Sequence, residues 1–427
     1  MTRVGPVTPK QKIELKFKIG RVFTPSAPIA NESLFAGRKQ QIARLINATS
    51  QRGQHAVLFG ERGVGKTSLA NVLSDFLTPL PGFIIVSTNC ESTTNFKAIW
   101  TNVFNELIAV KTEIGMGFGP PIHTEESPLS QLLSGNPSPE EIRRLLQQLG
   151  KPSIVIIDEL DRIKDEETIP RLADTIKTLS DHSTDSTLIL VGVADSLDTL
   201  VKEHRSIDRA LVQIQMPRMS PAELREIIDK GLKELGMTID SRAAKRISNL
   251  SHGLPHYTHS LALHAAQSAV DRDSMAINQD DVVEAIKSAI ENTQQSIKRN
   301  YHDATSSPRG NLYSEVLLSC ALAETDELGY FPAVNIRAPM SKIMGKPYDV
   351  PAFSRHLNDF CEKDRGAVLQ RSGYPKRYRF RFVNPLMEPF VVMKGISSGL
   401  ISSDILDSEK PIIHPVSNET PPLFEQF

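Results

Sequence analysis

One short stretch restricts this chain more than any other. Residues 60–67 read Gly-Glu-Arg-Gly-Val-Gly-Lys-Thr and fit the pattern G-x-x-x-x-G-K-[ST]. The apolar run 56–59 before it is typical of a buried strand, and the apolar spacing over 67–76 predicts a helix. Glycines in such a turn allow positive φ, so successive backbone N–H groups can face a phosphate. The stretch predicts a phosphate-binding loop within an α/β fold.

The residues of this loop have separate expected roles. Lys66 is expected to reach the β- and γ-phosphates of ATP, and the Thr67 hydroxyl is expected to hold Mg²⁺. The other expected nucleotide contacts are Gly60, Glu61, Arg62, Gly63, Val64, Gly65 and Ser68. The alternative is a glycine-rich turn that binds nothing.

A second strand pattern ends in two carboxylates. Asp158 and Glu159 follow the apolar run 153–157, and a continuous apolar run is typical of a strand buried on both faces. We expect Asp158 to take Mg²⁺ through water, and Glu159 to orient or deprotonate the attacking water. The alternative is an acidic pair that only complements the dipole of a following helix.

Composition sets broader limits. The chain has 427 residues, which suggests about three domains. Its 49 basic and 50 acidic residues nearly cancel, so overall charge gives no case for a nucleic-acid or membrane partner. The three cysteines are far apart, the first residues contain no apolar leader, and no run is long enough to span a membrane. We therefore expect a cytoplasmic protein.

Strand and helix patterns alternate over the first half of the chain. Further strands are predicted at 83–87, 187–193 and 210–216, and helices at 95–110, 139–149 and 169–179. This alternation predicts a doubly wound parallel sheet, with ligand at the carboxyl ends of the strands. The segment 111–139 is rich in Gly, Pro and Ser and predicts a long loop or insertion.

Taken together, these motifs resemble the AAA+ and STAND P-loop ATPases, in particular the origin-recognition and initiator-like ATPases. The resemblance spans residues 34–393 and implies binding of ATP and ADP, ATP hydrolysis and a homo-oligomer. It also implies an AAA+ core at 29–218, an all-α lid at 219–305 and a winged helix at 306–395. The charge and proline content of the two ends predict a basic, partly ordered N-terminal arm at 1–28 and an acidic, proline-containing tail at 396–427, which is disordered or docked at the periphery.

The resemblance implies further nucleotide contacts. Phe35 lies in the segment that borders adenine in these families. The alternative is a hydrophobic staple, in which this segment only packs against the start of the next helix. Asp195 occupies the position of a γ-phosphate sensor, with a helix N-cap as the alternative. Pro255 matches an adenine-contacting proline, and His256 stands where initiator ATPases carry a phosphate-sensing arginine. A neutral imidazole cannot replace a guanidinium, so a packing histidine is the alternative.

An arginine before the strand at 210–216 resembles the residue that reaches the γ-phosphate bound by a neighbouring subunit. Arg209 is the first choice and Arg205 the second, and either would stabilise transition-state charge. The alternative is a surface arginine paired with Glu203 or Asp208.

The sequence from 313 to 383 predicts three helices followed by a two-stranded wing, which together make a winged helix. Basic residues gather around the wing, which makes double-stranded DNA a candidate partner. The candidate contacts are Arg355 with Ser354 and Asn358 on the third helix, and Lys376, Arg377, Arg379 and Arg381 on the wing. Winged helices also dock proteins or inhibit their own chain.

Two functions therefore compete. In one, the ATPase acts on DNA, in replication, transposition or defence against mobile elements. In the other, it is a signalling switch triggered by a protein or ligand. A nucleotide-binding protein that hardly turns over is a third reading.

Overall fold

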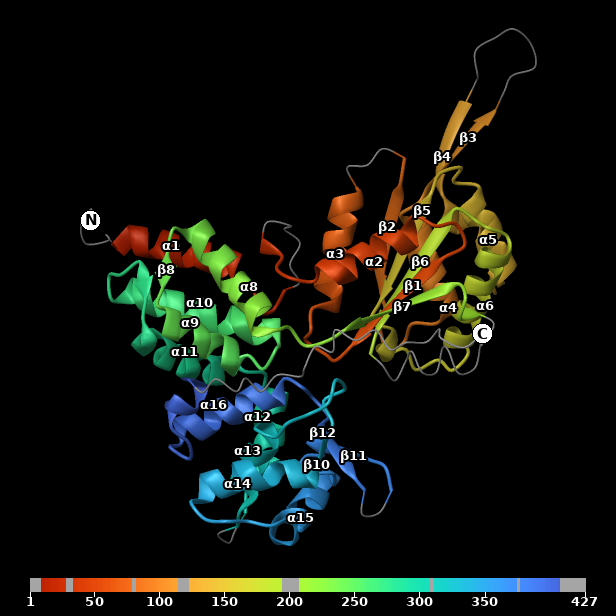
Figure 1. Ribbon diagram of the computed structural model, residues 1–427. Helices are drawn as coiled ribbons and strands as arrows, with labels where there is room; N and C mark the ends of the chain where they lie inside the picture. Colours follow the sequence, from red (N-terminus) through yellow and green to blue (C-terminus); the bar gives the residue numbers. More distant parts are fainter. Residues whose placement is uncertain are drawn as a thin grey trace, which may run out of the picture. The chain divides into compact units, whose positions relative to one another are not determined.

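The structure is a computed structural model that describes residues 9–27, 34–78, 82–113, 123–193, 207–307, 311–374 and 377–407. The chain divides into two compact units. Figure 1 shows the helices and strands of both units, coloured by their position in the sequence. One unit contains 28–61 and 65–216, and the other contains the chain up to 27, residues 62–64 and the chain from 217 onward.

The first unit is built on a five-stranded parallel sheet with the strand order β2-β5-β6-β1-β7. Its strands are β1 (His55–Gly60), β2 (Ile84–Asn89), β5 (Ser153–Asp158), β6 (Ser186–Gly192) and β7 (Leu211–Met216). Every residue of β5 and β6 is buried, as their continuous apolar sequences predict. Because all pairings are parallel, the carboxyl ends of the five strands lie at one edge.

Helices cover both faces of this sheet (Figure 1). They are α2 (Lys39–Thr49), α3 (Lys66–Leu77), α4 (Phe96–Asn105), α5 (Pro139–Gln147) and α6 (Thr168–Asp181). One hydrophobic core joins α4, α5 and α6 to the sheet through Trp100, Leu146, Ile176 and Val155, all of which are buried. The expected doubly wound P-loop fold is confirmed.

An antiparallel hairpin interrupts the pattern after α4. It consists of β3 (Ile108–Glu113) and β4 (His123–Pro128), followed by the short 3₁₀ helix η2 (Leu129–Leu132). The expected helix over 95–110 therefore ends early, and the described part of 111–139, for which a long loop or insertion was expected, contains the rest of this hairpin and η2. Alternate β-branched residues at Ile108, Val110 and Thr112 favour extended chain over helix, which explains why the helix ends before them.

The second unit begins with helices that match the expected all-α lid. They are α8 (Pro221–Leu235), α9 (Ser241–Leu250), α10 (Pro255–Asp271), α11 (Gln279–Asn292) and α12 (Gln295–Thr305), with a small ladder between β8 (Thr238–Ile239) and β9 (Ala276–Ile277). Ser220 and Glu223 form a capping box at the start of α8, where Pro221 occupies the first turn.

The N-terminal segment differs from the partly ordered arm that its charge suggested. It forms the helix α1 (Pro9–Val22), which packs against α8 and α10. Ile19 and Phe23 are buried four residues apart, and Lys12 and Lys16 pair with Asp273 and Asp271 at 2.8 and 2.6 Å. The sequence prediction weighted the lysines and missed this apolar pair. The described part of the arm is a helix that packs on the lid.

The C-terminal part follows the winged-helix order of elements. It contains α13 (Tyr313–Ala321), β10 (Phe331–Pro332), η5 (Ala333–Ile336), α14 (Arg337–Met344), α15 (Val350–Asp359), η6 (Lys363–Arg365), β11 (Leu369–Ser372), β12 (Arg379–Phe382), α16 (Met387–Ser397) and η7 (Ser403–Asp407). The wing has three antiparallel strands, in the order β10-β12-β11, where two were expected. The expected tail at 396–427 begins inside α16, and Asp404 of η7 lies 3.3 Å from Arg246 of α9. This start of the tail is therefore structured.

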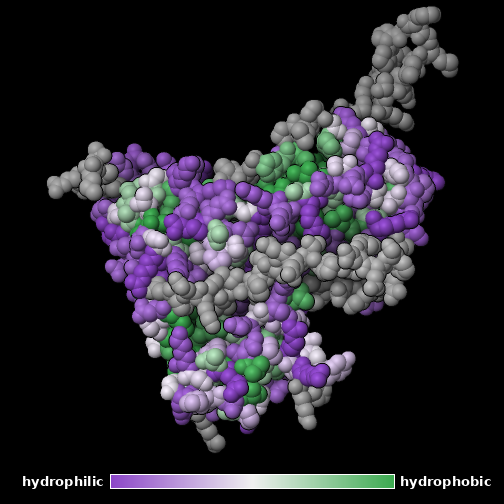
Figure 2. Space-filling view, viewed as in Figure 1, coloured by the Kyte–Doolittle hydropathy of each residue, from purple (hydrophilic) through white to green (hydrophobic). Residues whose placement is uncertain are grey.

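The face shown in Figure 2 is mostly hydrophilic, with smaller apolar areas. Among the residues that the structure describes, no helix combines the length and apolarity needed to cross a bilayer.

Candidate active site

The phosphate loop connects β1 to α3, and its glycines are required by geometry. Gly60 pairs with Met216 of β7, and a Cβ at Gly60 would lie 2.4 Å from the Met216 carbonyl oxygen. Gly63 and Gly65 have φ values of 87° and 93°, a left-handed conformation that side chains disfavour. Such turns orient backbone N–H groups toward a bound anion at a helix N-terminus, which here is the start of α3.

The side chain of Lys66 folds back onto the phosphate loop. Its Nζ donates to the carbonyl oxygens of Gly60 and Glu61 at 3.0 and 2.9 Å. A lysine ammonium on a flexible stem can exchange such carbonyls for an anion. The ammonium is thus held at the loop where its expected phosphate contact lies.

The two expected metal ligands contact each other. The Thr67 hydroxyl lies close enough to the Asp158 carboxylate to act on the pKa of that group, although the two residues come from separate elements. Burial raises the pKa of the Asp158 carboxyl, while the Thr67 hydroxyl and the hydrogen bond from the Glu159 N–H act against this shift. A hydroxyl and a carboxylate are hard oxygen ligands of the kind that Mg²⁺ prefers.

Glu159 lies directly beyond the buried strand end. It adopts the left-handed conformation (φ 59°, ψ 38°) before the short helix η3 (Leu160–Arg162). Its Oε2 accepts a hydrogen bond from Arg162 Nη1 at 2.7 Å, and both side chains are about half exposed. Sequence reasoning missed Arg162. The i, i+3 spacing of opposite charges was the only available signal.

Arg209 of the same unit is exposed, as a residue that reaches a second subunit must be. Its side chain is 81% exposed, and Nη2 lies 3.2 Å from Asp181 Oδ1. Among the described residues, the pairing partner is therefore Asp181 and not Asp208, whereas Glu203 lies outside the described residues. Phe35 is partly buried. Asp195 and Arg205 lie outside the described residues, as does most of the segment before Phe35.

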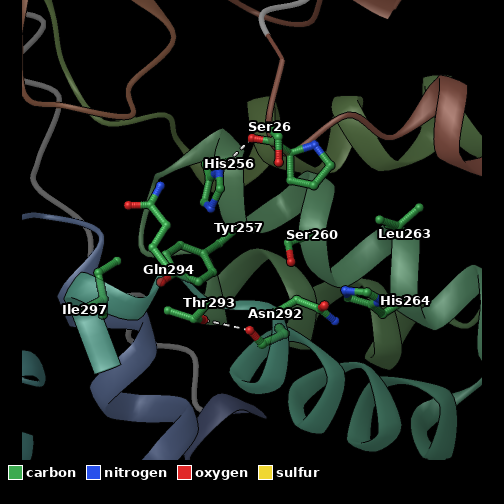
Figure 3. A pocket seen from close by; sticks show the side chains of 12 residues that line it. Ser26, His256, Tyr257, Ser260, Leu263, His264, Asn292, Thr293, Gln294 and Ile297 are labelled. Carbon is green, nitrogen blue, oxygen red and sulfur yellow. Dashed lines mark hydrogen bonds between the residues drawn. The ribbon is translucent and has the colours of Figure 1, made fainter. Parts of the chain in front are cut away.

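In the second unit, His256 contacts the chain that follows α1. Its Nδ1 lies 2.7 Å from the Pro25 carbonyl oxygen, and burial lowers the pKa of the imidazole despite that hydrogen bond. Pro255 starts α10. Figure 3 shows His256 on the wall of a cavity of about 330 Å³, which also includes Tyr257, His264 and Asn292 and has no charged side chain in its lining. Nucleotide contacts by Pro255 and His256 remain predictions.

Some of the candidate DNA-contacting residues are exposed, and others already contact residues of their own domain. Arg355 is 88% exposed and lies 3.7 Å from Asp359, and Arg377 is also exposed. By contrast, Arg379 is ion-paired with Asp326, and the Asn358 side chain accepts a hydrogen bond from Arg371 at 3.1 Å. Ser354 Oγ lies 3.4 Å from the Pro351 carbonyl oxygen. Lys376 lies outside the described residues.

A comparison with protein families identifies the segment that carries the phosphate loop. A family model described as AAA ATPase domain matches residues 34–191. This segment is therefore similar to AAA ATPase domains. It contains Lys66, Thr67, Asp158 and Glu159, whereas Arg209 lies beyond the matched residues. No curated protein matches the chain significantly.

Several solved structures are similar to the chain that contains this segment. Cdc6p from Pyrobaculum aerophilum is 16% identical, with 90% of this chain and 99% of that chain covered and a TM-score of 0.46. The ORC1 protein of Aeropyrum pernix, solved in complex with DNA, is 13% identical, with 89% and 97% covered and a TM-score of 0.47. A Walker-type ATPase of Pyrococcus abyssi is 16% identical, with 87% and 99% covered and a TM-score of 0.45.

Proposed function

We propose that the protein binds ATP with Mg²⁺ and hydrolyses it. The observation that carries this proposal is the contact between the Thr67 hydroxyl and the Asp158 carboxylate, beside Lys66 and Glu159 at the carboxyl edge of the sheet. A structural acidic pair at a helix start would not need the lysine and the hydroxyl that the start of α3 brings to it.

Each residue has a distinct part in this proposal. Backbone N–H groups of 60–65 and the Lys66 ammonium would hold the phosphates, and Thr67 and Asp158 would hold Mg²⁺. The bound metal supplies charge that stabilises the phosphoryl group in the transition state. Glu159 orients water and accepts its proton, and its partial exposure leaves it accessible to solvent.

We propose that Arg209 completes the site of a second copy of this chain. Its high exposure supports this role, because only a surface side chain can reach a neighbour. The test mixes two inactive variants, Glu159→Gln and Arg209→Ala. The Arg209→Ala variant keeps Glu159, and the Glu159→Gln variant keeps Arg209. A site formed between one copy of each contains both intact residues and should recover ATPase activity. A mixture that is no more active than its components would contradict the proposal.

For the C-terminal part, we propose contact with double-stranded DNA through the exposed Arg355 and Arg377. Neutralising phosphate contacts reduces the slope of log K against log salt by about 0.9 per contact. Arg355→Gln with Arg377→Gln should therefore weaken binding and flatten that slope. Lys233→Gln, an exposed change on α8, is the matched control. Equal slopes for all proteins would reject these contacts.

A signalling switch is the second candidate, and a specific observation favours it. Three wing arginines are engaged inside the domain: Arg379 with Asp326, Arg371 with Asn358, and Arg381 over the Tyr330 ring at 4.7 Å. These contacts occupy the three guanidinium groups within the domain, and the contact with Asp326 also neutralises the charge of Arg379. If the wild type shows no duplex binding even at about 50 mM salt, where phosphate contacts are strong, the switch is the better proposal.

A further inference from the structure

A buried ion pair joins the start of the lid to α16, the last α-helix in the part of the chain that the structure describes. Arg218 Nη1 lies 2.6 Å from Glu388 Oε2, and Nη2 lies 2.8 Å from Oε1, so the contact is bidentate. The two side chains are only 7% and 6% exposed. Burial raises the pKa of the Glu388 carboxyl, but the Arg218 guanidinium outweighs this effect and holds the pKa well below its usual value. The pair is therefore charged inside the unit.

The turn before α10 forms the third side of this contact. The His252 carbonyl oxygen accepts from Arg218 Nη1 at 3.4 Å, and His252 Nδ1 lies 3.8 Å from Glu388 Oε2. Met219 N donates to the Gly253 carbonyl oxygen at 2.8 Å. A Cβ at Gly253 would lie 2.6 Å from the Arg218 Cβ, so this close approach needs glycine.

A neutral contact lies beside the ion pair. The buried Tyr257 hydroxyl donates to the Leu386 carbonyl oxygen at 2.6 Å, which joins α10 to the residue before α16. Three chain segments thus meet at one place: 217–219 directly after β7, the turn 252–254, and 386–388 at the start of α16. The first of these is the connection by which the chain leaves the ATPase sheet.

A buried pair of this kind is sensitive to the loss of either partner. Removing one member leaves an uncompensated charge in a poorly solvated site, whereas an exposed pair contributes little. The chain offers an exposed comparison in the same lid, because Arg225 and Asp229 of α8 pair at 2.8 Å with both side chains open to solvent.

We propose that the Arg218–Glu388 pair couples the lid to the C-terminal domain, so that a displacement of segment 217–219 moves α16 with it. The pair fixes α16 at its N-terminal turn, and α16 packs against α13 of the C-terminal domain. Any change in the connection after β7 is then passed to the C-terminal domain without a separate hinge. The inference does not depend on ATP hydrolysis and is tested without nucleotide.

The test is hydrogen–deuterium exchange of the full chain for the wild type, Glu388→Gln and Arg225→Gln. Glu388→Gln keeps the side-chain shape and removes the charge. We expect exchange to rise tenfold or more in 217–219, 252–254 and α16 together, and Arg225→Gln to leave all three unchanged. A rise confined to α16 would overturn the proposal.

Arg218→Lys keeps the charge but loses the bidentate geometry, and it serves as the second variant if Glu388→Gln does not fold. It should raise exchange in the same three segments, by less than Glu388→Gln does. Unchanged exchange in Arg218→Lys, or a rise at segment 217–219 alone, would also overturn the proposal. Since ATP uptake is measured separately, a failure of the proposed ATPase activity cannot be confused with a failure of this coupling.

Discussion

The Glu159 carboxylate is hydrogen-bonded to Arg162 Nη1 at 2.7 Å, within the single turn that follows β5. The pair leaves the carboxylate next to Asp158 and near the phosphate loop, at the edge where a bound nucleotide is proposed. A left-handed backbone at Glu159 turns the chain away from the strand direction. The residue proposed to activate water is thus held by its own turn.

Glu159→Gln should lower the rate of phosphate release by about 10² or more while ATP binding is retained. A general base contributes roughly 10²–10⁴ to a rate, and glutamine keeps the shape without accepting the proton. Asp161→Asn, two residues further on, is the control and should leave the rate near that of wild type. Equal phosphate release by wild type and Glu159→Gln would remove Glu159 from catalysis.

Gly60→Ala should destabilise the ATPase domain by about 1–3 kcal/mol, because overpacking would force β1 away from β7. Gly135→Ala is the matched control, since an added Cβ there has no neighbour within 4 Å. Trp100, the single tryptophan, is buried in this domain and reports its unfolding by fluorescence. Equal urea midpoints for the two variants would show that the loop does not require glycine at this position.

Phe23→Ala should reduce the protection of α8 and α10 against hydrogen exchange by about 3 kcal/mol, the usual range for losing a buried phenylalanine. The Phe23 ring fills the space above Gly231, where an added Cβ would lie 2.5 Å from the ring. Phe17→Ala on α1 is the control, because Phe17 is 63% exposed. If both changes had the same small effect, α1 would not be part of the lid.

Acidification should destabilise the ATPase domain through His55. Burial lowers the pKa of this imidazole to about 4, and its Nδ1 accepts a hydrogen bond from the Leu188 N–H. In the unfolded chain the imidazole of His55 binds a proton near pH 6.5. The free energy of unfolding is therefore highest above that pH and falls as the pH drops toward 4. Each pH unit in this window lowers the free energy of unfolding by about 1.4 kcal/mol, so the loss between pH 6.5 and 5 is about 2 kcal/mol.

Urea unfolding followed by Trp100 fluorescence at pH 7.5 and 5.0 measures this loss. His55→Asn keeps a hydrogen-bond acceptor but cannot titrate, so its pH dependence should be smaller by about 2 kcal/mol. His182→Asn, at an exposed position of the same domain, should behave like wild type. A pH dependence unchanged by His55→Asn would assign the effect to other groups.

The sheet and its site could be predicted because their signals are local. A continuous apolar run identifies β5 without knowledge of its neighbours, and the spacing from Gly60 to Thr67 specifies the loop by itself. The direct contact between Thr67 and Asp158 then follows from parallel strands that share an edge.

Other features depend on partners far away in the chain. Arg218 carries no sequence signal that assigns Glu388 to it, 170 residues later. The basic residues interspersed along α1 concealed the packing of Ile19 and Phe23, because the prediction weighed charge rather than the spacing of the apolar residues. The pairing of Arg209 with Asp181 also exists only in the tertiary structure, and it could not be predicted from the sequence for the same reason.

The most direct test of the account is a titration of the folded chain with ATP and Mg²⁺, carried out on wild type and Lys66→Ala. Trp100 fluorescence confirms that both proteins are folded. The account predicts saturable ATP uptake by wild type and its loss in Lys66→Ala. Absence of uptake by wild type, or equal uptake by both proteins, would contradict it.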